Sequence, residues 1–291
     1  MNGSRPLPGA FCFLAMLGVW CPTFASAQMS IPTDIVEVQL IADTAAVEAG
    51  KPFELGVLLT IKPKWHIYWT NPGDSGDPTT VTWKLPPGFS AGPLKYPTPL
   101  RFEQEGPVIS FGYEDRVLLS ATITPPADLP AGRTLKFAAD AAWMSCETIC
   151  YPGSGSAALE LPVGAARASE QSEIFAQTEE TRPVMLQKND EVVRDARIVS
   201  TVGASGGELT VTIDWAGRPP ANIDFFPPAI ESANWAQANV ETSDRRTVAT
   251  VSVRPFSGRQ LAAGEHQAVI GYDIEPGKRR GVALTFTVAG Q

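Results

Sequence analysis

The chain has 291 residues and a formal net charge of −8, with 23 Lys and Arg against 31 Asp and Glu. Nucleic acids and anionic membranes both bind basic protein surfaces, so this acidic composition excludes them as partners. After the N-terminal segment no run of eighteen or more apolar residues occurs, so no membrane-spanning helix is predicted.

Residues 1–27 have the features of a secretory signal peptide. Arg5 precedes an apolar stretch at 9–24, and Ala25-Ser26-Ala27 supplies the small residues that signal peptidase requires. Cleavage after Ala27 would leave 264 residues beginning at Gln28. The sequence therefore predicts a periplasmic protein that is not inserted in the membrane.

The region that follows the signal, 28–165, reads as β-structure. Short apolar or alternating segments, separated by Pro and Gly clusters, predict strands. These strands are expected at 35–40, 53–59, 117–123, 134–143 and 157–163. Their number and spacing favour a sandwich of the immunoglobulin type.

Residues 166–183 differ in composition from what precedes them. The segment 169–177 begins with Ser, has early acidic residues and lacks Pro and Gly, which predicts a short capped helix that Pro183 stops. From 184 to 291 strands return, at 196–202, 208–215, 222–226, 247–253, 267–272 and 282–288. The expected fold is all-β, with two immunoglobulin-like β-sandwich domains joined by a short helical linker.

Two cysteines, Cys146 and Cys150, remain once Cys12 and Cys21 are removed with the signal peptide. They lie between two predicted strands, so a hairpin turn is expected to bring them to bonding distance. The pair could be a structural disulfide, which is common in exported proteins. However, a loop of about five residues gives only about 2 kcal/mol of stabilisation, and turns are accessible to thiol–disulfide exchange. Spacing alone leaves both interpretations open.

Two aromatic segments are further candidates. Residues 65–76 could form a binding loop, or a core strand that ends in a turn. Phe111-Gly112-Tyr113 could form a mobile flap, or a turn with one buried ring. His66 could join the cysteines and Met144 in a soft copper(I) site. No Ser-His-Asp arrangement, phosphate-binding glycine loop or zinc-protease motif occurs, so no cofactor is predicted.

Taken together, these motifs resemble one family. The order of residues 65–76, 97–99, 111–114 and 141–152 is similar to that in the periplasmic N-terminal region of the DsbD/ScsB thiol:disulfide interchange proteins. The likeness covers roughly residues 30–165. The linker and second β-domain look like the ScsB branch, which is associated with copper tolerance.

The resemblance implies a pair that cycles between dithiol and disulfide, a protein-disulfide reductase-like activity. By motif position Cys150 would form the mixed disulfide and Cys146 would resolve it. Phe111 and Tyr113 would act as an aromatic cap, and Trp143 would contribute to the cap or partner surface. The partners would be periplasmic thioredoxin-fold proteins and a membrane electron donor.

In the family a membrane domain and a CxxC thioredoxin-like domain follow, whereas this sequence ends at Gln291 without them. We therefore expect the pair to depend on a separate electron donor. Two other functions remain compatible with the sequence. One is a non-catalytic β-sandwich module with a structural disulfide, and the other is a copper-binding tolerance protein.

Overall fold

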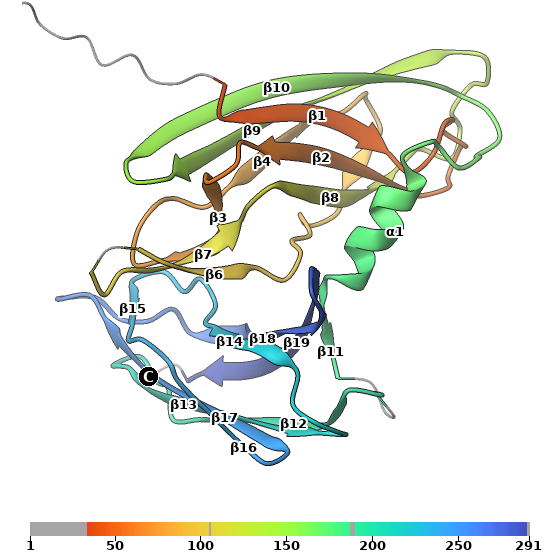
Figure 1. Ribbon diagram of the computed structural model, residues 1–291. Coiled ribbons are helices and arrows are strands. Elements are labelled where there is room, and N and C mark those ends of the chain that lie inside the picture. The colour runs from red at the N-terminus through yellow and green to blue at the C-terminus, as the bar shows by residue number, and fades with distance from the viewer. Residues whose placement is uncertain (1–33, 105, 187–189, 290–291) are drawn as a thin grey trace, which may run out of the picture. The chain divides into compact units, whose positions relative to one another are not determined.

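The computed structural model describes residues 34–104, 106–186 and 190–289. The predicted signal peptide, with Cys12 and Cys21, lies outside these residues. The described chain consists of strands and one α-helix (Figure 1). This confirms the predicted all-β class, and each of the eleven strands expected from the sequence is present.

The first ten strands form two sheets. Their bounds are β1 Val36–Ala42, β2 Phe53–Ile61, β3 His66–Gly73, β4 Thr80–Lys84, β5 Ser90–Ala91, β6 Leu100–Glu103, β7 Ile109–Tyr113, β8 Arg116–Thr124, β9 Thr134–Cys146 and β10 Cys150–Pro162. One sheet has the order β1-β2-β8-β5 and the other β10-β9-β3-β7-β6, with β4 also paired to β9. β9 and β10 are the two longest strands of this half and pair along their whole length (Figure 1).

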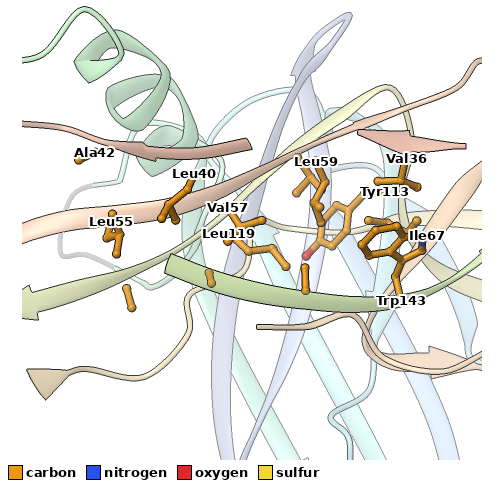
Figure 2. Close-up of a cluster of buried hydrophobic side chains, with 14 of the residues drawn as sticks. Val36, Leu40, Ala42, Leu55, Val57, Leu59, Ile67, Tyr113, Leu119 and Trp143 are labelled. Atoms are coloured by element: carbon orange, nitrogen blue, oxygen red, sulfur yellow. The ribbon is translucent and has the colours of Figure 1, made fainter. Parts of the chain in front are cut away.

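The core of this half lies between the two sheets. Leu55, Val57 and Leu119 come from the first sheet, and Ile67 and Phe137 come from the second. All five side chains are fully buried, and the close-up in Figure 2 shows several of them together. Side chains alternate between the two faces of a strand, so Leu55, Val57 and Leu119 all lie on the inner face of the first sheet.

The single helix, α1 (Ser172–Glu180), packs on the opposite face of the first sheet. Its Phe175 is buried against Ile41, Leu58 and Leu118, which alternate with the core residues of β1, β2 and β8. The residue before the helix, Gln171, makes no side-chain cap, although its backbone N–H donates to Ser169 Oγ. A helix after residue 165 is confirmed, but it spans Ser172–Glu180 rather than 169–177 and lacks the predicted side-chain cap. It is attached to the sheet through an apolar contact.

Nine further strands follow the helix. They are β11 Pro183–Met185, β12 Val193–Ser200, β13 Gly207–Trp215, β14 Ala221–Phe226, β15 Ala233–Trp235, β16 Asn239–Ser243, β17 Arg246–Pro255, β18 Gly264–Glu275 and β19 Lys278–Val288. They form a sheet β11-β19-β18-β14 and a sheet β12-β13-β17-β15, with β16 paired to β17. A second core, centred on Trp215, Leu209, Ile213 and Ile270, fills the space between them.

The core of the first half includes two residues of the second half. Phe226 and Val269, from β14 and β18, belong to the core of the first half, and the described residues group into one compact unit. The division at residues 165 and 184 stays a prediction. Within the described ranges, no helix has the length and apolarity needed to cross a membrane.

Candidate functional site

The two cysteines lie at the end of the β9–β10 hairpin. Cys146 is the last residue of β9 and Cys150 the first of β10, and they stand opposite each other in the antiparallel register. Their sulfur atoms form a disulfide. The three residues between them, Glu147, Thr148 and Ile149, are exposed. The expectation of a pair at a hairpin turn is therefore confirmed.

The two cysteines differ sharply in exposure. Cys146 is 1% exposed, whereas Cys150 is exposed together with the turn that precedes it. A thiolate attacking a disulfide must approach one sulfur in line with the bond, so access decides which sulfur is attacked. Of the two cysteines, Cys150 is the one that lies at the surface.

Tyr68, on β3, places its hydroxyl beside both sulfurs. Its hydroxyl donates to Cys146 Sγ at 2.8 Å, and it lies 3.6 Å from Cys150 Sγ and 3.4 Å from Ser75 Oγ. The Tyr68 side chain is fully buried. Gly76 packs on its ring so closely that a Cβ there would overlap the ring atoms. Hydrogen bonds to charged acceptors are the strong ones, so this hydroxyl can stabilise a thiolate at Cys146.

A second group of side chains surrounds Tyr68. His66 is paired with Cys146 in the register between β3 and β9, and its ring meets the Tyr68 ring edge-on at 5.2 Å. The ring of Phe102, on β6, stacks on the His66 ring, with the two ring centroids 4.5 Å apart. The Gln104 amide nitrogen lies 3.3 Å from His66 Nε2. Burial lowers the pKa of His66, which favours the neutral ring, and a neutral ring nitrogen can accept this hydrogen bond.

Comparison with known proteins identifies this half of the chain. Residues 35–162 match the family model described as thiol:disulfide interchange protein DsbD, N-terminal. This segment of the chain therefore carries a DsbD N-terminal domain. No curated protein sequence matches it at a significant level.

Among solved structures, the N-terminal periplasmic domain of ScsB from Proteus mirabilis is similar to this chain. The alignment has a TM-score of 0.62 and 17% identity, and it covers 90% of this chain and 96% of that one. At this identity the match concerns the fold, and it extends over both β-sandwiches. The reduced DsbD N-terminal domain of Neisseria meningitidis also matches, with a TM-score of 0.27 and 11% identity over 45% of this chain and 90% of that one.

The aromatic residues that the family resemblance nominates are buried. Phe111 and Tyr113 lie in β7, where Phe111 packs edge-on against Phe226 and the Tyr113 hydroxyl donates to Pro97 O. Figure 2 shows Tyr113 among the aliphatic side chains of the core. At 111–113 the structure has a strand with both rings buried, rather than a turn with one buried ring. Their predicted role as cap stays a prediction.

Trp143 is also buried, and it lies on β9 a few residues before Cys146. It lies on β9 opposite Gly153, and a Cβ at Gly153 would overlap its indole ring. Figure 2 shows Trp143 beside Ile67 in the core. Only 8% of the Trp143 surface is exposed, so neighbouring residues cover the ring. A direct contact between Trp143 and a partner stays a prediction.

Three residues of the site were not singled out by the sequence analysis. Phe102 and Gln104 follow the Pro97-Thr98-Pro99 motif, but only the pairing of β6 with β7 brings them next to β3. Ile149 is a large apolar side chain that is 55% exposed beside Cys150. Its sequence signal was an apolar residue in an otherwise polar turn.

The possible copper site finds no support in the described residues. Across 34–104, 106–186 and 190–289, no three His, Cys, Asp or Glu side chains are grouped so that they could hold a metal ion. His66 instead uses its ring against Phe102, Tyr68 and Gln104.

Proposed function

We propose that this protein is a periplasmic thiol–disulfide exchange protein whose reactive group is the Cys146–Cys150 pair. The observation that carries the proposal is the asymmetry of the pair. Cys150 is an exposed residue, whereas Cys146 is buried and its sulfur accepts a hydrogen bond from the Tyr68 hydroxyl. A disulfide that only joined two strands would need neither feature. The match of residues 35–162 to the DsbD N-terminal family model and the Cys146–Cys150 disulfide support the same chemistry.

Reduction of the pair would proceed in two exchanges. A thiolate of a partner dithiol attacks Cys150 Sγ, and the bond to Cys146 breaks. Cys146 leaves as a thiolate that accepts the Tyr68 hydrogen bond and then takes up a proton. The second thiolate of the partner attacks the mixed disulfide and releases Cys150. The partner dithiol is thereby oxidised and this disulfide reduced, with two electrons and two protons transferred.

Delivery to a client reverses these steps. The Cys150 thiolate attacks the client disulfide, and Cys146 then attacks Cys150 Sγ, which releases the reduced client. By analogy with the family, the clients are periplasmic thioredoxin-fold proteins, and a membrane protein supplies the electrons. Ile149, exposed beside Cys150, gives such a partner an apolar contact next to the reacting sulfur.

The cap of the site is assigned in this proposal to Phe102. It is half-buried and stacks on His66, which is the residue opposite Cys146. Phe111 and Tyr113 then support the site indirectly, because their buried rings fix β7, which pairs with both β3 and β6.

The reduction potential of the pair tests the proposal. Equilibration with glutathione, followed by alkylation and mass determination, should give a potential above about −300 mV, the range of labile disulfides. A potential below that value, together with no oxidation of a reduced thioredoxin-fold protein, would identify a structural disulfide. A Cys146→Ser, Cys150→Ser double variant serves as the unreactive control.

A further inference from the structure

The segment Pro97-Thr98-Pro99 connects directly to β6, the strand that carries Phe102. The side chain of Thr98 is 4% exposed and lies on two glycines of the C-terminal half. These glycines, Gly271 on β18 and Gly281 on β19, stand opposite each other in the register. A Cβ at Gly281 would overlap Thr98 Oγ1, and a Cβ at Gly271 would lie 2.9 Å from Thr98 Cγ2. The glycine pair therefore forms a notch that fits Thr98.

Arg279 holds the next residue of the same segment. Its Nε donates to Pro99 O at 2.6 Å, and its terminal nitrogens pair with Asp224 at 2.5 Å and Asp273 at 2.9 Å. The Arg279 side chain is 8% exposed. The planar guanidinium presents several donors in one fixed arrangement, so the two carboxylates orient the donor that Pro99 receives. Burial within this network raises the pKa of the Asp224 carboxyl above its ordinary value.

The C-terminal half also contacts strands β3 and β7. Phe226 meets Trp69 of β3 at 6.0 Å and Phe111 of β7 at 5.2 Å. Asn71, near the end of β3, donates through Nδ2 to Pro227 O at 2.8 Å. The C-terminal half thus contacts β3, which carries His66 and Tyr68, and the segment that leads into β6, which carries Phe102. It also contacts β7, which pairs with both of these strands.

We propose that Arg279 and the Gly271–Gly281 notch are positioning elements of the redox site. By fixing residues 97–99 they hold β6 so that Phe102 stays stacked on His66 next to Cys146. The expected effect on thiol–disulfide exchange rests on the proposed function. The coupling between the C-terminal half and β6 does not. The C-terminal half therefore acts on the cysteines through β6, and loosening the notch exposes the reduced pair.

A single methyl group tests this link. Gly281→Ala places a Cβ against Thr98 without changing any charge, and Gly217→Ala is the matched control, because nothing lies within 4 Å of its Cβ position. Neither glycine has a positive φ, so alanine is compatible with both backbones. The protein is reduced with dithiothreitol, and two quantities are measured. These are amide hydrogen exchange in β6 and the rate of thiol alkylation by iodoacetamide.

We expect Gly281→Ala to speed both hydrogen exchange in β6 and alkylation by about fivefold or more, the lower end of typical coupling between sites. Gly217→Ala should match the wild type within about twofold. In a Phe102→Ala background the effect of Gly281→Ala on alkylation should disappear, because the cap it acts through is gone. Unchanged exchange in β6, unchanged alkylation, or an equal effect in both backgrounds would each overturn the proposal.

Arg279→Lys gives a second test if Gly281→Ala does not fold. Lysine keeps the charge between the carboxylates but lacks the fixed fork that also reaches Pro99, so the same two changes are expected. Arg246→Lys is its control, an exposed residue paired with Asp214. Both readouts use chemically reduced protein. They therefore report on the link even if no thioredoxin-fold partner exchanges with the pair, which is the result that would remove the proposed function.

Discussion

Removal of the Tyr68 hydroxyl should slow reduction of the disulfide. In the oxidised protein this hydroxyl donates to Cys146 Sγ at 2.8 Å, and in the proposed reaction negative charge develops on that sulfur. A hydrogen bond to a fully charged acceptor contributes roughly 1.5–3 kcal/mol. With about half of the charge transferred at the transition state, about 1 kcal/mol is lost in Tyr68→Phe. This corresponds to an approximately fivefold slower reaction.

The assay is the second-order rate constant for reduction by dithiothreitol, measured by acid quench and alkylation. Tyr151→Phe is the matched control, because Tyr151 is the neighbour of Cys150 and packs on Trp65. Its rate should stay within about twofold of wild type. A Tyr68→Phe variant that melts like the wild type and is reduced at the wild-type rate would refute the role of the hydroxyl.

Three other measurements test separate parts of the structure. His66→Gln should reduce the loss of stability on acidification. Because burial lowers the pKa of His66, its neutral form stabilises the fold above pH 6.5, and this is lost as the pH falls, by up to about 1.4 kcal/mol per pH unit in denaturant titrations. Ile149→Ser should slow exchange with a thioredoxin-fold partner about fivefold or more while reduction by dithiothreitol is unchanged; equal slowing of both would exclude a docking role. Phe175→Ala should lower the free energy of unfolding by about 3 kcal/mol, and a loss under 1 kcal/mol would show that α1 is not attached as described.

The all-β class and most strands of the fold could be predicted because they depend on local pattern. Alternation and Pro or Gly turns placed strands such as β1, β13 and β19 within a few residues of their observed bounds. Seven strands were not predicted, namely β4, β5, β6, β7, β11, β15 and β16. None of them is longer than five residues, and β7 is buried along its whole length, so it lacks the alternation of a half-exposed strand.

The site was predictable only in part for a similar reason. The hairpin that joins Cys146 and Cys150 is local, so spacing and the flanking strands indicated it. Phe102 reaches His66 through the non-local pairing of β6 with β7 and β7 with β3, which no short segment of sequence records. The buried position of Phe111 likewise follows from Phe226, which is more than one hundred residues away in the chain.

The central claim is that Cys150 is the attacked sulfur and Cys146 the leaving group. The most direct test mixes the Cys146→Ser and Cys150→Ser variants separately with a thioredoxin-fold protein whose resolving cysteine has been replaced. Non-reducing gels and mass spectrometry then measure the mixed disulfide. We predict a stable complex through Cys150 in the Cys146→Ser variant, and at least tenfold less with Cys150→Ser, because Cys146 is 1% exposed. Equal trapping by both variants, or trapping only through Cys146, would contradict the account.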